Sequence, residues 1–191
     1  MSDQLTSGPE VGPLIDEIEQ LRAKVAQLQQ RVEQLDQLAH RDSLIELPNR
    51  RGFMRALERF IDRASRYDEP SAMLYVDLDG LKRINDSLGH QAGDQALIQV
   101  AGMLEAGVRK SDVVARIGGD EFGILLAHSD SNKAHDAASR LVDLIASKGF
   151  TTDGGVLPLS VAIGATMING GDTPDEVIAR ADQEMYRRKA A

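Results

Sequence analysis

The first periodic segment of the chain is a run of apolar residues spaced seven apart between residues 14 and 40. One series consists of leucines and the other mainly of β-branched residues: Leu14, Leu21, Leu28 and Leu35, and Ile18, Val25, Val32 and Ala39. Leucine at heptad position d with isoleucine or valine at position a favours a parallel two-stranded coiled coil. We therefore predict a dimeric coiled-coil stalk over residues 14–40, preceded by a disordered segment over residues 1–13.

The charged residues beside this stripe agree with a parallel dimer. The g and following e positions pair Glu17 with Arg22, Lys24 with Gln29, and Arg31 with Asp36. Two of these pairs are attractive and one is neutral, so none opposes the parallel arrangement. The alternative is a single amphipathic helix packed on its own domain, but such helices usually have a broader apolar face.

From residue 41 the pattern changes to that of a mixed domain. Asn49 is a good N-cap, and Ala72–Val76 is a continuous apolar run that predicts a buried strand. The expected helices cover residues 50–66, 81–88, 91–107, 131–148 and 174–189, and the other expected strands cover 113–117, 122–127 and 157–167. This order predicts an α+β fold over residues 41–191, close to the ferredoxin-like arrangement, with a mostly antiparallel central sheet.

Composition narrows the class of protein. The 191 residues are 42% hydrophobic and 27% charged, and they carry a net charge of −8. An acidic surface is a poor partner for nucleic-acid polymers or anionic membranes, and the absence of cysteine excludes disulfides and thiolate metal sites. Without a long apolar run or a signal-peptide pattern, we expect a soluble, cytoplasmic protein with no membrane insertion. A phosphate ligand would then require cations or local basic groups.

Candidate chemistry lies at the end of the buried strand. Asp77 follows the apolar run, and Asp120 and Glu121 follow two glycines in a hairpin that can lie beside it. Clustered carboxylates suit hard cations such as Mg²⁺, which share oxygen ligands with phosphates. Spacing alone leaves an alternative open, in which Asp77 and Asp79 cap the next helix and the hairpin is merely solvated.

Five ordered blocks of sequence resemble the GGDEF domains of diguanylate cyclases. The blocks are Asp42–Phe53, Asp77–Asp94, Arg116–Phe122, Ser160–Ala165 and Ala181–Lys189. The resemblance covers residues 41–191 and implies a fold like the nucleotidyl-cyclase and polymerase palm. It also implies an enzyme that condenses two GTP into cyclic di-GMP and two pyrophosphates, with two domains facing each other antiparallel.

The resemblance also implies roles for single residues. Asp77, the Leu78 carbonyl and Asp120 would hold two Mg²⁺ or Mn²⁺ ions per active site. Glu121 would be a further metal ligand or the base for the 3′-hydroxyl. The remaining roles concern GTP: Gly118 and Gly119 would let the backbone approach the nucleotide, Asn85 and Asp94 would read guanine, and Lys82 and Lys189 would contact phosphate.

A second site is implied by Arg109 and Asp112, which match the family's inhibitory RxxD site for the cyclic product. Arg140 would complete it from a neighbouring domain. Taken alone, such a tetrapeptide is more often a surface charge cluster. Two other readings remain open, namely a catalytically inactive domain that senses cyclic di-GMP and a coiled-coil adaptor with a vestigial domain.

Overall fold

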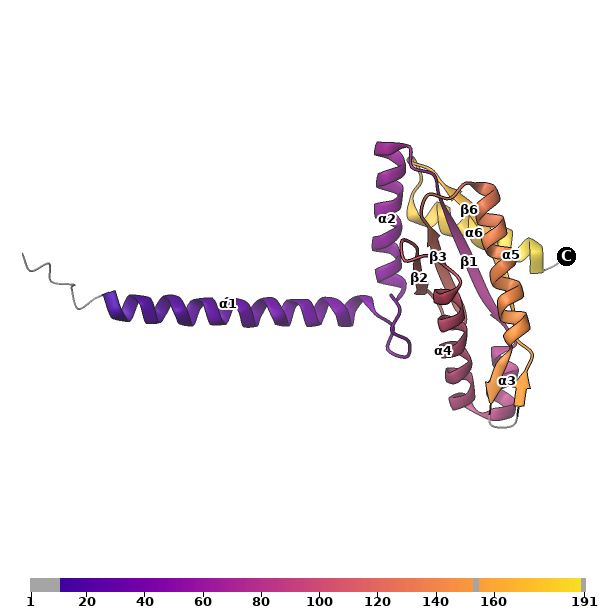
Figure 1. The fold of residues 1–191 in the computed structure, drawn as a ribbon, viewed down its shortest axis with the longest axis horizontal. Helices are drawn as coiled ribbons and strands as arrows, with labels where there is room; N and C mark the ends of the chain where they lie inside the picture. The colour runs from indigo at the N-terminus through magenta and orange to yellow at the C-terminus, as the bar shows by residue number, and fades with distance from the viewer. Residues whose placement is uncertain (1–10, 153–154, 190–191) are drawn as a thin grey trace, which may run out of the picture. The chain divides into compact units, whose positions relative to one another are not determined.

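The computed structural model describes residues 11–152 and 155–189. The chain divides between residues 39 and 40 into two units, which we describe separately. The first contains helix α1 (Val11–His40), which is 30 residues long and whose last residue is the first of the second unit (Figure 1). Residues 11–13, which we expected to be disordered, are helical, and Pro13 is tolerated because amides of the first turn have no helical acceptor. The expected disorder of residues 1–10 lies outside the described residues.

The heptad stripe of α1 is exposed in the single chain. Its a and d side chains between residues 14 and 35 are from 43% to 65% exposed. A row of exposed leucine, isoleucine and valine on one helix face is costly in water and is typical of a helix that packs against another. None of the described helices is both long enough and apolar enough to cross a membrane.

The second unit is built on one antiparallel sheet. Its strands β1 (Ser71–Asp79), β2 (Val113–Arg116), β3 (Glu121–Leu126) and β6 (Ser160–Ile168) lie in the order β2-β3-β1-β6. β1 is central and pairs with β3 on one side and β6 on the other. The predicted hairpin between β2 and β3 is confirmed, with Arg116 opposite Phe122. This is the ferredoxin-like strand order, so the predicted α+β fold is confirmed.

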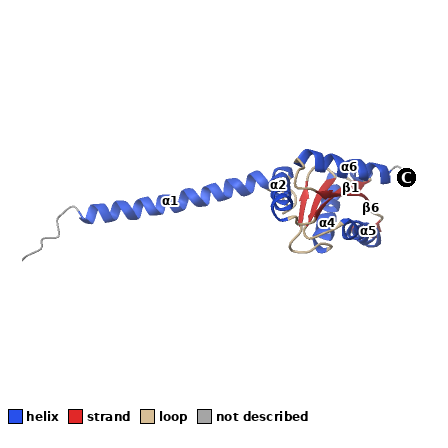
Figure 2. Cartoon of the chain, turned by 90° about the horizontal axis from the view of Figure 1, so that it is seen from above, coloured by secondary structure: helices blue, strands red, loops and turns tan. Residues whose placement is uncertain are grey.

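Helices cover both faces of the sheet (Figure 2). On one face, α4 (His90–Ala106) and α5 (Ser131–Lys148) pack with the core that includes Leu74, Val76 and Leu78 of β1. On the other face, α2 (Arg50–Tyr67) and α6 (Pro174–Lys189) pack with the core that includes Met73 and Tyr75. Alternate residues of β1 therefore enter different cores, which is why its sequence is an uninterrupted apolar run.

The local signals placed most helices correctly. The Asn49 side chain caps α2 by accepting from the Gly52 amide at 3.1 Å, and Gly89 ends the short helix α3 (Leu81–Leu88). The strand expected over residues 157–167 is wrong at its start, because Leu157 belongs to a separate hairpin of β4 (Phe150–Thr152) and β5 (Gly155–Leu157). Pro158 explains the break, since it has no amide to donate to a ladder.

Candidate active site

Asp77 and Glu121 lie directly opposite each other in the pairing of β1 with β3. The adjacent Leu78 amide donates to the Asp120 carbonyl at 2.9 Å, so Asp77 and Glu121 occupy a non-hydrogen-bonded position. Side chains at such positions are close and point to the same face, and like charges there destabilise the sheet. The fold therefore brings two of the predicted carboxylates together, and other groups must offset their repulsion.

Lys189 is the first of these groups. Its ammonium contacts the Asp77 carboxylate and lies 3.0 Å from Asp79 Oδ1. The hydrogen bond to Asp77 raises the pKa of Lys189 most. Burial lowers this pKa and Asp79 raises it, so the pKa of Lys189 lies well above its usual range. The Ser160 hydroxyl donates to the other oxygen of Asp79 at 3.0 Å. Lys189, predicted to contact phosphate, thus contacts the carboxylates at the end of β1.

Tyr75 is the second group, and sequence analysis missed it. Its hydroxyl donates to Glu121 Oε1 at 2.7 Å, and its side chain is buried. Burial and then the Glu121 carboxylate raise the pKa of Tyr75 far above its usual range. Tyr75 lies two residues before Asp77 on the same face of β1, so the only sequence signal was its strand periodicity.

The two glycines of the hairpin turn differ in their surroundings. A Cβ on Gly118 would lie 1.9 Å from Glu121 Oε2, whereas a Cβ on Gly119 would meet nothing within 4 Å. A Cβ on Gly118 would therefore displace the Glu121 carboxylate, whereas one on Gly119 would displace no other group. The predicted approach of both glycines to a nucleotide stays a prediction.

Arg116 ties this hairpin to the segment before α2. Its guanidinium donates to the Gly119 carbonyl at 2.7 Å and pairs with Asp42 at 3.2 Å. The Arg116 amide also donates to the Pro48 carbonyl at 2.9 Å. Both charged side chains are largely buried, so the contact is screened little by solvent. Both residues were part of the recognised sequence blocks, but their pairing across the fold had no local signal.

The predicted guanine-reading residues lie at the junction of α3 and α4. The Asn85 side chain lies so close to Gly93 that a Cβ there would be 1.9 Å from its Oδ1. Asp94 is the next residue and is exposed at the start of the second turn of α4, and Lys82 is exposed on the first turn of α3. The structure thus gathers Asn85 and Asp94 at one end of two helices and places Lys82 on the same short helix.

The carboxylate site suits a hard cation in the type of its donors. Asp77, Asp120, Glu121 and the Leu78 carbonyl supply only oxygen, which Mg²⁺ and Mn²⁺ prefer. Asp77 and Glu121 lie opposite each other, and a cation bound between them would relieve the repulsion of their two carboxylates. Among the described residues, no three acidic or histidine side chains converge closely enough to bind a metal. The assignment of two ions therefore stays a prediction.

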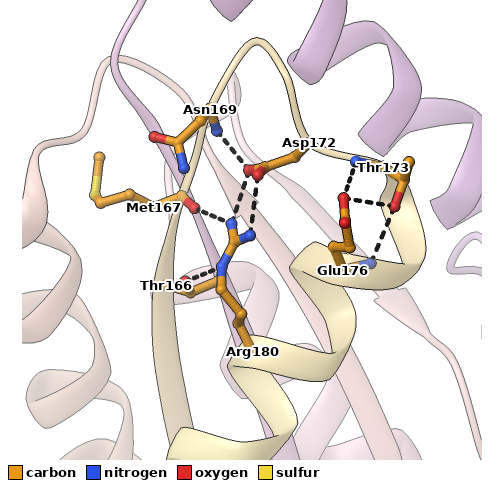
Figure 3. Close-up of polar contacts among 7 residues, drawn as sticks. All are labelled: Thr166, Met167, Asn169, Asp172, Thr173, Glu176 and Arg180. Atoms are coloured by element: carbon orange, nitrogen blue, oxygen red, sulfur yellow. Dashed lines mark hydrogen bonds and ion pairs between the residues drawn. The ribbon is translucent and has the colours of Figure 1, made fainter.

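A network at the start of α6 fixes the helix that carries Lys189 (Figure 3). Arg180 donates to both oxygens of Asp172 at 2.9 and 2.7 Å and to the Met167 carbonyl of β6 at 2.9 Å. This guanidinium holds the pKa of Asp172 below its usual range. Thr173 and Glu176 form a capping box, with the Thr173 amide 2.8 Å from Glu176 Oε2. These contacts tie the first turns of α6 to β6.

The residues predicted to bind product line one pocket of about 170 Å³. Arg109, Asp112 and Arg140 of the same chain all lie in its wall, together with Lys133 and Asp136. The Asp112 carboxylate accepts from the backbone amides of Arg109 at 2.9 Å and Ala127 at 3.1 Å. Asp112 therefore holds the turn that presents Arg109. Arg140, which we expected from a neighbouring domain, also lines this pocket within one chain.

Comparison with known sequences identifies the family. Residues 39–191 match the model described as the diguanylate cyclase GGDEF domain. The chain is 39% identical over 186 residues to diguanylate cyclase TpbB of Pseudomonas aeruginosa, covering 95% of this chain and 42% of that protein. It is 40% identical over 157 residues to the bifunctional diguanylate cyclase/cyclic di-GMP phosphodiesterase MucR of the same species, covering 82% of this chain and 23% of MucR. The chain thus spans less than half of these relatives.

Solved structures agree with the sequence comparison. The GGDEF domain of PA1120 (TpbB or YfiN) from P. aeruginosa matches with a TM-score of 0.74 and 36% identity, covering 79% of this chain and 89% of that one. The coiled coil and GGDEF domain of DgcB from Caulobacter crescentus, in complex with c-di-GMP, matches with a TM-score of 0.84 and 24% identity, covering 93% and 94%. The DgcB match supports the fold alone. From its motifs, its fold and these relatives, the chain belongs to the diguanylate cyclase GGDEF-domain family.

Proposed function

We propose that the chain is a diguanylate cyclase that condenses two GTP molecules into cyclic di-GMP and releases two pyrophosphates. The observation that carries this proposal is the opposition of Asp77 and Glu121 on the β1–β3 pair, inside a domain of this family. The named relatives TpbB and MucR support it. Two domains would face each other antiparallel, so that each supplies one GTP to the shared reaction.

Each condensation forms one bond between a 3′-oxygen and an α-phosphorus and breaks the bond to pyrophosphate. Cyclases of this family depend on divalent metal, and Mg²⁺ or Mn²⁺ supplies positive charge for the phosphates and lowers the pKa of the attacking hydroxyl. Asp77, Asp120, Glu121 and the Leu78 carbonyl would hold it. Glu121 serves as a ligand or as the acceptor of the hydroxyl proton.

The other predicted residues would bind the nucleotide. Lys82 and Lys189 carry the positive charge for phosphate oxygens, which requires Lys189 to exchange its carboxylate contacts for phosphate. Asp94 is exposed at the helix junction, where its carboxylate can accept from the N1–H and 2-amino groups that distinguish guanine from adenine. Asn85 beside it supplies an amide for the same edge. Holding the reactants in position in this way supplies much of the rate acceleration in an in-line displacement.

Two further features extend the proposal. The exposed heptad stripe of α1 would form a parallel homodimer, which makes the encounter of two domains effectively intramolecular. The pocket at Arg109 and Arg140 would bind cyclic di-GMP, because guanidinium groups bind phosphate with charge-assisted hydrogen bonds. Product bound there would inhibit the enzyme.

The test of the proposed activity is incubation of the purified chain with GTP and Mg²⁺, followed by chromatography of the nucleotides. The proposal expects cyclic di-GMP. A folded, dimeric protein that binds cyclic di-GMP but forms none would instead identify the inactive sensor considered from sequence.

A further inference from the structure

We propose that Tyr75 is a positioning residue for the cyclase reaction, and that its hydroxyl holds the Glu121 carboxylate in one orientation at the active site. The inference rests on the proposed cyclase function. It adds a role for a residue that sequence analysis treated only as part of a buried strand.

The first support is the hydrogen bond itself. The Tyr75 hydroxyl donates to Glu121 Oε1 at 2.7 Å, and the two residues are 46 positions apart in the chain. Tyr75 is only 5% exposed and packs in the core between the sheet, α2 and α6. A buried hydroxyl needs a partner, and this one has a charged acceptor. The bond is therefore partly shielded from water, and its charged acceptor makes it stronger than a hydrogen bond between neutral groups.

The second support is the position of the other carboxylate oxygen. Glu121 Oε2 lies against the bare Cα of Gly118, where a Cβ would be 1.9 Å away. The Ile117 and Gly118 amides both donate to the Glu121 carbonyl, at 2.9 and 3.2 Å. The backbone of Glu121 is thus fixed by the hairpin, and its carboxylate is held between Tyr75 on β1 and Gly118 at the end of the turn.

The Tyr75 hydroxyl takes part in the site as a hydrogen-bond donor. Its acceptor is Glu121 Oε1 at 2.7 Å, and its ring packs in the core formed with α2 and α6, which fixes the direction of the bond.

An oriented Glu121 matters because Asp77 lies directly opposite. Two free carboxylates would turn away from each other, and the energy of bringing them back would be added to each catalytic cycle. A carboxylate held in place beforehand avoids that reorganisation, and sites tolerate displacements of only about 0.5 Å. Tyr75 would thus favour cation binding and the chemical step, with little effect on GTP recognition at the α3–α4 junction.

The test compares Tyr75→Phe, which keeps the ring, with Tyr67→Phe, which removes an exposed hydroxyl at the end of α2. For Tyr75→Phe assayed at saturating Mg²⁺, we expect kcat to fall about tenfold while KM for GTP stays the same. Mn²⁺ binding, measured calorimetrically with the α,β-methylene analogue of GTP, should weaken severalfold. Tyr67→Phe should match the wild type in all three quantities.

A second comparison shows whether Tyr75 acts through Glu121. In a Glu121→Gln background, adding Tyr75→Phe should leave Mn²⁺ affinity unchanged, because the acceptor has lost its charge. Wild-type Mn²⁺ affinity in Tyr75→Phe, or an equal loss in both backgrounds, would overturn the proposal. If Tyr75→Phe does not fold, Gly118→Ala displaces the same carboxylate from its other side, and unchanged Mn²⁺ binding there would also overturn it. If the wild type makes no cyclic di-GMP, the proposed function fails, but the Mn²⁺ comparison still decides the role of Tyr75.

Discussion

The ammonium of Lys189, at the end of the last helix, contacts the carboxylate of Asp77, at the end of the first strand, 112 residues away in the chain. Asp77 is itself opposite Glu121, and Lys189 also contacts Asp79. A lysine therefore supplies the positive charge that this group of carboxylates needs. With a divalent cation bound, Asp77 would no longer need this ammonium, and Lys189 would be available to contact phosphate in the proposed reaction.

The first prediction concerns the stability of this pairing. Lys189→Met removes the ammonium and leaves Asp77 facing Glu121, so the free energy of unfolding in EDTA should fall by about 0.5–1 kcal/mol, the value for a partly exposed ion pair. With saturating Mg²⁺ the loss should be smaller, because the cation relieves the same repulsion. Urea denaturation of Lys189→Met and of the wild type, in EDTA and in saturating Mg²⁺, measures this change in the free energy of unfolding.

Arg187→Met is the matched control, since it removes a cation of the same helix that pairs with Glu184 at 3.3 Å. Its effect should not depend on Mg²⁺. A Lys189→Met variant that loses equal stability with and without Mg²⁺ would show that the ammonium and the divalent cation do not serve the same carboxylates.

The second prediction separates the two glycines of the hairpin. In Gly118→Ala the new Cβ meets the Glu121 carboxylate, which must swing away and lose its bond from Tyr75. We expect thermal and urea denaturation to show that the free energy of unfolding falls by about 1–2 kcal/mol. In Gly119→Ala the Cβ enters open space, so stability should change by less than about 0.5 kcal/mol. Equal losses in both variants would contradict the packing described for Gly118.

The third prediction concerns product binding. Arg109→Ala removes a guanidinium from the pocket shared with Arg140, so affinity for cyclic di-GMP should fall about ten- to hundredfold and added product should inhibit less. The initial rate should stay the same, because the change leaves the carboxylate site intact. Lys110→Ala changes an exposed neighbouring charge and serves as the control. If cyclic di-GMP inhibited Arg109→Ala as strongly as it inhibits the wild type, this pocket would not be the inhibitory site.

The fourth prediction concerns the stalk. Leu28→Lys places a charge at a d position of α1, whereas Gln30→Lys places the same charge at an outer f position. Analytical ultracentrifugation should show a monomer for Leu28→Lys and a dimer for Gln30→Lys. The activity per molecule of Leu28→Lys should rise with protein concentration, because two domains must then meet by diffusion. A dimeric Leu28→Lys protein would show that α1 does not hold the dimer together.

The parts of the fold that sequence predicted are those with local signals. The Asn49 side chain caps the start of α2 by accepting a hydrogen bond from the amide three residues later. The two glycines before Asp120 indicate the turn of the hairpin. The continuous apolar strand identified β1 as central, because both of its faces are covered. The hairpin of β4 and β5 was missed because its strands are short and the apolar run continues past Pro158.

The parts of the site that sequence did not predict depend on register between distant segments. The bonds from Tyr75 to Glu121 and from Arg116 to Asp42 join residues 46 and 74 positions apart. A shift of one residue in the β1–β3 pairing would turn Tyr75 to the opposite face. No periodicity within either segment contains that information. Carboxylate positions were foreseeable from motif residues, whereas the groups that hold them were not.

We propose that this chain makes cyclic di-GMP at the carboxylates of β1 and the β2–β3 hairpin. The direct measurement is the yield of cyclic di-GMP and pyrophosphate from GTP and Mg²⁺, by chromatography and mass spectrometry, for the wild type and for Asp120→Asn of the same fold and oligomeric state. We predict two pyrophosphates for each cyclic di-GMP from the wild type, and at most a trace of product from Asp120→Asn. If the folded, dimeric wild type made no cyclic di-GMP, the proposed activity would be wrong; an undiminished rate in Asp120→Asn would show that these carboxylates do not carry it.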